Sequence, residues 1–127
     1  MILVTGATGQ IGREVVRLLA RDHVPFRAFV RDTHRARDVL DTPVELVPGD
    51  LADPTSLDRA LRDVDTLFVV SNNPALELGA VDAAIRQGVR RIVKSSAVGF
   101  RDQPPPGHRE VETAIRHSGL AYTSYAL

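Results

Sequence analysis

Three glycines follow the apolar N-terminal residues at intervals of three: Gly6, Gly9 and Gly12. Glycine lets a backbone turn sharply and come close to a bound group, because no Cβ stands in the way. We expect Gly6 to turn the chain, Gly9 to leave room for a phosphate, and Gly12 to let the next helix pack closely against a sheet. This spacing favours the binding of a pyrophosphate by backbone N–H groups at a helix N-terminus.

The residues before the glycines predict a strand and those after them predict a helix, which is the order that a phosphate-binding loop requires. Residues 1–4 are a short apolar run that predicts a buried strand. Ile11, Val15, Leu18 and Leu19 then recur at helical spacing, which predicts one apolar helix face. The spacing TGxxGxxG departs from the commoner GxGxxG, so a ligand-free turn is the alternative. The predicted phosphate loop comprises Gly6, Ala7, Thr8, Gly9, Gln10, Ile11 and Gly12.

Two charged residues follow the second predicted strand, where the adenosine ribose of a dinucleotide would lie. Arg31 has a planar fork of donors that suits a 2′-phosphate, which favours NADP(H). The adjacent Asp32 is placed to accept a ribose hydroxyl, which would favour NAD(H). We favour the phosphate interpretation, because NAD specificity usually places a carboxylate closest to the strand end; two solvated turn residues are the remaining alternative.

Polar residues also follow the later strands. We predict that Asp50 and Leu51 border the adenine, although a turn aspartate with a core leucine explains them nearly as well. Ser71 and Asn72 are predicted to lie where the chain passes the nicotinamide ribose, with a helix N-cap as the alternative. Ser95 is predicted to lie close to where the nicotinamide and its substrate would meet. Ser96 is a weak catalytic candidate, because a serine at a strand end more often satisfies backbone groups.

Short apolar strands alternate with helical patterns along the chain, which indicates repeated βαβ units. We predict an α/β Rossmann fold: a doubly wound parallel sheet of six strands in the order 3-2-1-4-5-6. After the first helix, strands are expected at 25–30, 44–47, 66–70, 89–93 and 121–125, and helices at 33–40, from 54 onward, at 74–87 and at 110–118.

Two of these helices have clear start signals and apolar faces. Asp53 and Pro54 predict an N-cap and first helical residue, and the buried face that follows comprises Leu57, Ala60 and Leu61. The helix at 74–87 is expected to bury Leu78, Val81, Ala84 and Ile85.

Composition is that of one ordinary globular domain, which we assign to residues 1–127. The chain is 43% hydrophobic, and its sixteen basic residues balance sixteen acidic ones, so no overall field favours nucleic acid or an anionic membrane. It has no cysteine, which excludes disulfides and thiolate chemistry and fits a reducing compartment. The chain has no apolar run of membrane-spanning length, and we expect a cytoplasmic protein. The four histidines lack the spacing of metal ligands, so we expect no metal site.

Several segments together resemble the NmrA-like, atypical branch of the short-chain dehydrogenases/reductases. The segments are ILVTGATGQIG (2–12), FRAFVRD (26–32), VPGDLADPTSL (47–57), VDTLFVVS (64–71) and GHREVETAIRHSGLAYT (107–123). The resemblance implies that the glycine loop binds phosphate, that Arg31 contacts the 2′-phosphate, and that Asp50 and Leu51 border the adenine. The family includes NAD(P)H-dependent quinone reductases and regulators that bind the dinucleotide without turning it over.

The sequence departs from the superfamily in two respects. The Tyr-x-x-x-Lys pair, in which a lysine lowers the pKa of the phenol, is absent, as it is in NmrA-like members. The only lysine, Lys94, falls in a predicted strand with no tyrosine placed to use it. Relatives also continue beyond their sixth strand into a region that builds the substrate pocket, and we expect that region to be absent here.

Two functional hypotheses follow. The first is an NADP(H)-dependent oxidoreductase that reduces a quinone or another conjugated carbonyl by direct hydride transfer. The second is a dinucleotide sensor or interaction module, or an inactive fragment of a longer reductase. In either case the partners are a nicotinamide dinucleotide and, at an open sixth strand, a second copy or another protein; NAD(H) stays an alternative cofactor.

Overall fold

The computed structural model describes residues 1–41, 43–70, 73–95, 113–114, 119 and 121–125. Strands and helices alternate, as the sequence predicts. The strands are β1 (Ile2–Thr5), β2 (Phe26–Val30), β3 (Glu45–Pro48), β4 (Thr66–Val69), β5 (Arg91–Ser95) and β6 (Ala121–Tyr125). The helices are α1 (Gln10–Arg21), α2 (Thr33–Val39), α3 (Pro54–Ala60) and α4 (Pro74–Arg86). The helix expected at 110–118 falls almost entirely outside the described residues.

All strands pair in parallel, and the order across the sheet is β3-β2-β1-β4-β5-β6. The predicted parallel α/β sheet and the order of its first five strands are confirmed, and β6 extends the sheet beyond β5. Because β1 lies between β2 and β4, the chain changes direction across the sheet at β1. Ligands of such sheets bind beyond the carboxyl ends of the strands at this switch point.

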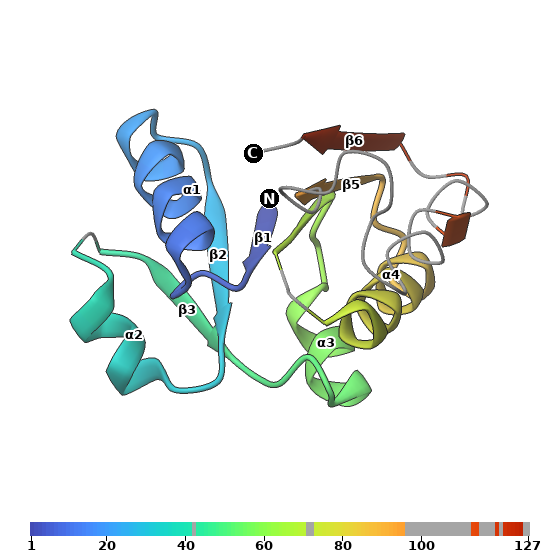
Figure 1. The fold of residues 1–127 in the computed structure, drawn as a ribbon, viewed down its shortest axis with the longest axis horizontal. Coiled ribbons are helices and arrows are strands. Elements are labelled where there is room, and N and C mark those ends of the chain that lie inside the picture. The colour runs from blue at the N-terminus through green and yellow to red at the C-terminus, as the bar shows by residue number, and fades with distance from the viewer. Residues whose placement is uncertain (42, 71–72, 96–112, 115–118, 120, 126–127) are drawn as a thin grey trace.

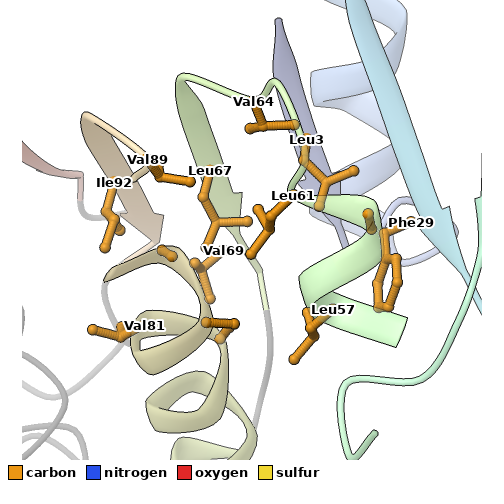
Figure 2. Packing of buried hydrophobic residues seen from close by; sticks show 14 residues of the cluster. Leu3, Phe29, Leu57, Leu61, Val64, Leu67, Val69, Val81, Val89 and Ile92 are labelled. Atoms are coloured by element: carbon orange, nitrogen blue, oxygen red, sulfur yellow. The ribbon is translucent and has the colours of Figure 1, made fainter. Parts of the chain in front are cut away.

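Helices cover both faces of the sheet, with α1 and α2 on one side and α3 and α4 on the other (Figure 1). Successive strand residues face opposite sides. Val4 therefore belongs to the cluster under α1 and α2, together with Val16 and Ala36. Leu3 belongs to the cluster under α3 and α4. Figure 2 shows this second cluster, in which Phe29 from β2 lies beside α3 and Val81 is contributed by α4.

Two of the predicted helix faces are confirmed in part, because Val15 and Leu19 of α1 pack against the core and Val81 and Ala84 of α4 are buried. In α1 the buried residues are Gly12 and Val16, whereas Leu18, which we expected to pack on the sheet, is 39% exposed. In α4 the buried residues are Glu77, Ala80, Val81, Ala83 and Ala84, and Ile85 is 46% exposed. Most of these buried residues are alanines, and the ionisable Glu77 lies among them. The predicted face of α3 is confirmed.

Side-chain caps start three of the helices. Asp53 accepts a hydrogen bond from the Thr55 N–H at 3.1 Å, which confirms the predicted N-cap of α3. Asp32 caps α2 and Asn73 caps α4 in the same way. No helix in the described part of the chain has the length and apolar character needed to cross a membrane.

Candidate dinucleotide-binding site

A crevice of about 230 Å³ opens at the carboxyl ends of β1, β2 and β3, at the switch point of the sheet. It gathers six of the predicted site residues, from three separate segments of the sequence: Gly6, Ala7, Thr8, Arg31, Asp50 and Leu51. Four further residues complete the lining: Phe29, Val30, Gly49 and Leu76. The predicted loop residues Gly9, Gln10, Ile11 and Gly12 lie just beyond it, at the N-cap and in the first turn of α1.

Gly6 and Gly12 are required by the fold itself. Gly6 has a φ of +65°, which is the left-handed region, and a Cβ there would clash with the carbonyl oxygen of Val70. A Cβ on Gly12 would clash with the Gly6 carbonyl oxygen and lie 2.8 Å from the Ala7 Cα. The close packing that we expected between α1 and the sheet at Gly12 is therefore packing of α1 against its own preceding loop.

Gly9 is different, because the protein has room for a side chain there. Its φ is −76°, and a Cβ would meet only the Gly6 carbonyl oxygen, at an ordinary contact distance of 3.4 Å. The fold thus tolerates a larger residue at Gly9. The space that its missing side chain leaves open lies at the start of α1, where an anionic ligand would approach.

The N-terminus of α1 is the one start among α1 to α4 at which no side chain caps the helix. Gly9 is the N-cap residue, and the first turn holds no acidic residue. The N–H groups of a first helical turn carry partial positive charge and need a partner, which is why helix starts bind phosphates. This geometry suits the pyrophosphate that the glycine spacing predicts.

Thr5 ties the loop to the other half of the sheet. Its buried hydroxyl donates to the Phe68 carbonyl and accepts from the Val70 N–H, both at 3.1 Å. The two bonds connect the end of β1 to the end of β4 and hold Val70 against Gly6. Thr5 therefore holds the ends of β1 and β4 together at the point where the glycine loop leaves the sheet.

The two charged residues after β2 have separate environments. Asp32 uses its carboxylate to cap α2, accepting from the Arg35 N–H at 3.1 Å. Arg31 is exposed at the crevice and forms no ion pair with any described residue. The Asp32 side chain is thus already engaged within the protein, whereas Arg31 is an exposed residue of the crevice lining.

Asp50 lies in the turn between β3 and α3. One of its carboxylate oxygens, Oδ1, accepts from the Ala52 N–H at 2.9 Å, and Leu51 lines the crevice next to it. The preceding Gly49 packs under the ring of Phe29 so closely that a Cβ would clash with it. From the sequence, Phe29 was expected only to lie within the strand at 25–30, and Gly49 only to follow the strand at 44–47. Their contact forms the floor of the crevice and joins β2 to the end of β3. Because the two residues are far apart in the sequence, no local sequence pattern predicts the contact.

Four predicted site residues remain to be located: Ser71, Asn72, Ser95 and Ser96. Ser95 is the last residue of β5. Ser71, Asn72 and Ser96 lie outside the described residues. Their predicted contacts stay predictions.

Lys94 and Glu77 form a buried ion pair beside this region, which the sequence did not predict. Their Nζ and Oε2 atoms lie 3.5 Å apart, and both side chains are at most 1% exposed. Burial away from water raises the pKa of the Glu77 carboxyl, and the positive charge of Lys94 opposes part of that rise. The pair joins the second turn of α4 to the carboxyl end of β5.

Comparison with known proteins agrees with this geometry. The NAD(P)H-binding family profile matches residues 6–125. The chain is 39% identical over 131 aligned residues to an NAD(P)H azoreductase of Xenophilus azovorans, covering 97% of this chain and 46% of that protein. It is 42% identical to a (4-alkanoyl-5-oxo-2,5-dihydrofuran-3-yl)methyl phosphate reductase of Streptomyces griseus, covering 97% of this chain and 45% of that protein.

A solved structure gives the same result. The fold superposes with a TM-score of 0.82 on an NADPH-dependent quinone oxidoreductase of Escherichia coli complexed with NADPH, at 29% identity, covering 98% of this chain and 47% of that one. The chain thus spans about half the length of the relatives it matches. These matches confirm the resemblance to NmrA-like, atypical short-chain dehydrogenases/reductases. The chain belongs to the NAD(P)H-binding family of Rossmann-fold proteins.

Proposed function

We propose that this protein binds NADP(H) in the crevice and belongs to an oxidoreductase that reduces quinones or related conjugated carbonyls. The observation that carries the proposal is the space at Gly9, in front of a helix start that no side chain caps. Because the fold would accept a side chain there, a ligand best explains why the position is left open. In this arrangement the loop from Gly6 to Gly12 binds the pyrophosphate.

The adenosine end of the dinucleotide would lie over the rest of the crevice. Asp50 would accept a hydrogen bond from the adenine amino group, and Leu51 would cover one face of the base. Arg31 would form charge-assisted bonds with the 2′-phosphate. Ser71 and Asn72 would lie along the nicotinamide ribose, and Ser95 would lie close to where the nicotinamide meets the acceptor.

The preference for NADP(H) over NAD(H) rests on the division of roles between Arg31 and Asp32. Asp32 uses one carboxylate oxygen for the N-cap of α2, whereas Arg31 lines the crevice and could offer its fork of donors to a phosphate there. The E. coli quinone oxidoreductase, to which the chain is similar, is described as complexed with NADPH.

When bound, NADPH would supply a hydride to the acceptor, and the residues of this chain would orient the two molecules and exclude water. A quinone needs no tyrosine acid to accept a hydride, so the lack of a Tyr-x-x-x-Lys pair does not oppose this activity. Ser96 remains our weak candidate for a residue near the acceptor. The absence of cysteine supports a cytoplasmic location.

The second candidate is a dinucleotide-sensing or interaction module without turnover, or an inactive part of a longer reductase. One observation favours it: the only lysine is buried and forms an ion pair with Glu77. A partner or a second copy would then join at the outer edge of β6, which ends the sheet.

One experiment separates the candidates. NADPH oxidation by the purified 127-residue chain is measured with a panel of quinones, beside calorimetric titrations with NADPH and NADH. Quinone-dependent oxidation supports the oxidoreductase. Binding without turnover supports the sensor or the fragment, and no binding of either nucleotide contradicts both candidates.

A further inference from the structure

A single buried hydroxyl organises the turn that presents Asp50 to the crevice. Ser56 lies in the first turn of α3 and is 8% exposed. Its Oγ accepts from the Asp50 N–H at 3.1 Å and lies 3.0 Å from the Asp50 carbonyl oxygen and 2.9 Å from that of Asp53. Because a hydroxyl has one hydrogen, it donates to one of these two carbonyls at a time. Ser56 therefore holds Asp50 from both sides of its backbone.

The Asp50 side chain is fixed as well. Its Oδ1 accepts from the Ala52 N–H at 2.9 Å, and the Asp50 carbonyl accepts from the Asp53 N–H at 2.9 Å. Neither bond uses the second carboxylate oxygen, Oδ2. With the backbone held by Ser56 and Oδ1 held by Ala52, Oδ2 has a defined direction and can accept a hydrogen bond from a ligand.

The floor next to this turn leaves little freedom. The Gly49 N–H donates to the Val30 carbonyl at 2.9 Å, which continues the pairing of β2 and β3 into the turn. Gly49 lies under the Phe29 ring, and a Cβ on it would lie 3.0 Å from the Ser56 Cβ. Ser56 thus closes the turn from the α3 side, and Phe29 closes it from the sheet side.

We propose that Ser56 is a positioning residue that aims the Asp50 carboxylate at the base of the dinucleotide and so makes the site select adenine over hypoxanthine. Adenine carries a 6-amino group, which donates to a carboxylate oxygen. Hypoxanthine carries a 6-oxo group, whose partial negative charge would face that same oxygen. NADPH thus gains a hydrogen bond from its adenine to a charged acceptor, whereas the hypoxanthine analogue gains none there and meets electrostatic repulsion instead.

This inference rests on the proposed function, since it assumes that the adenine lies over Asp50. The two probes are NADPH and reduced nicotinamide hypoxanthine dinucleotide phosphate, which differ only at position 6 of the base. The dissociation constants of both are measured by titration for the wild type and for Ser56→Ala. The wild type is expected to prefer NADPH by about tenfold or more, as for one hydrogen bond to a charged group.

Ser56→Ala is expected to lose most of this preference, mainly through weaker NADPH binding. Ala60→Gly, a change in the same helix at a buried residue that does not line the crevice, serves as the matched control: it is expected to lower stability and keep the preference. Ser56→Thr retains a hydroxyl and is expected to retain the preference. Where Ser56→Ala fails to fold, Ser56→Cys, which keeps the shape but bonds weakly, replaces it.

A second variant tests the route through Asp50. In Asp50→Asn the amide oxygen can keep the bond from the Ala52 N–H, which turns the amide NH2 toward the base. The preference is then expected to invert toward hypoxanthine. In the double variant Ser56→Ala/Asp50→Asn the inversion is expected to disappear, because the amide is no longer aimed.

The outcomes separate this inference from the function on which it rests. A wild type that binds neither probe overturns the proposed function. If the wild type prefers adenine and Ser56→Ala keeps the full preference, with a loss of stability like that of Ala60→Gly, the role of Ser56 is overturned. The proposed function is unaffected by that result. Equal binding of both probes by the wild type also overturns the inference, and leaves dinucleotide binding intact.

Discussion

The glycine loop shows, residue by residue, how a fold requirement differs from a ligand requirement. Substitution at Gly6 or Gly12 would force a Cβ into backbone atoms, whereas a Cβ at Gly9 meets one oxygen at ordinary distance. The three glycines are alike in sequence, but backbone packing requires Gly6 and Gly12, whereas it does not require Gly9. Gly9 is therefore the position at which binding can be removed with the fold kept.

We expect Gly9→Val to fold and to lose dinucleotide binding. Its unfolding free energy should fall by roughly 1 kcal/mol, because valine is a poor N-cap residue, while its side chain fills the phosphate space. Gly6→Val, the matched change at a φ of +65°, should not fold. Circular dichroism and NADPH titration of both variants check this; a Gly9→Val protein that binds NADPH like the wild type would exclude the proposed phosphate site.

Arg31 and Asp32 are neighbours with different tasks. We expect Arg31→Ala to weaken NADPH binding by about ten- to one-hundredfold, the range for a lost bond to a charged group, and to leave NADH binding nearly unchanged. Arg59→Ala removes the same charge from an exposed position on α3 and should affect neither nucleotide. Titration of both variants with both nucleotides is the measurement, and an equal loss for NADPH and NADH would refute a 2′-phosphate role.

At the scale of elements, long-range polar contacts fasten the helices and strands around the crevice. Thr5 joins β1 to β4, Ser56 joins α3 to the turn after β3, and the Glu77–Lys94 pair joins α4 to β5. Each contact sits near the carboxyl edge of the sheet, where the strands themselves end. The ladder hydrogen bonds stop there, so side chains have to hold the edges that line the site.

The Glu77–Lys94 contact predicts a pH dependence of stability. Because burial raises the Glu77 pKa in the folded state, the folded protein binds more protons than the unfolded one between the usual glutamate pKa and the raised value. The contribution of Glu77 to the unfolding free energy is therefore fully present below the usual pKa and is lost as the pH rises through the raised pKa.

Urea unfolding of the wild type and Glu77→Gln from pH 4 to pH 8 isolates this contribution. The wild type is expected to lose stability relative to Glu77→Gln as the pH rises through this window, because glutamine does not titrate. Glu14→Gln, at an exposed carboxylate, gives the control difference. A difference in unfolding free energy between the wild type and Glu77→Gln that stays flat with pH would show that the Glu77 pKa is not shifted upward.

At the scale of the whole molecule, the crevice draws on segments that lie far apart in the chain, from Gly6 to Leu76. A ligand that touches β1, β2, the β3–α3 turn and α4 together binds only the folded state. It must therefore stabilise the whole domain by mass action.

We expect NADPH at one hundred times its dissociation constant to raise the unfolding free energy by about 2.7 kcal/mol, which for a chain of this size is a Tm increase on the order of 10 °C. Thermal unfolding with and without NADPH measures this. AMP, which lacks the second phosphate, the 2′-phosphate and the nicotinamide, should give a far smaller shift. An unchanged Tm at saturating NADPH and NADH would contradict dinucleotide binding by this chain.

Much of the fold could be predicted because its signals are local. The glycine spacing, the alternation of strands and helices, the cap at Asp53 and the order of the first five strands each depend on neighbouring residues or on general rules of chain connection. The predicted site residues Arg31, Asp50 and Leu51 follow the ends of their strands, so parallel pairing alone brings them to one edge of the sheet.

What the sequence determined by itself is thus the kind of fold and the edge at which a dinucleotide would bind. The tertiary structure alone decided that Leu18 and Ile85 stay exposed, that Phe29 packs on Gly49, and that Ser56 holds Asp50. It also decided that Glu77 and Lys94 meet beneath α4. The physical reason is that each of these outcomes depends on how closely two elements approach and at what rotation, which the pattern within either element does not contain.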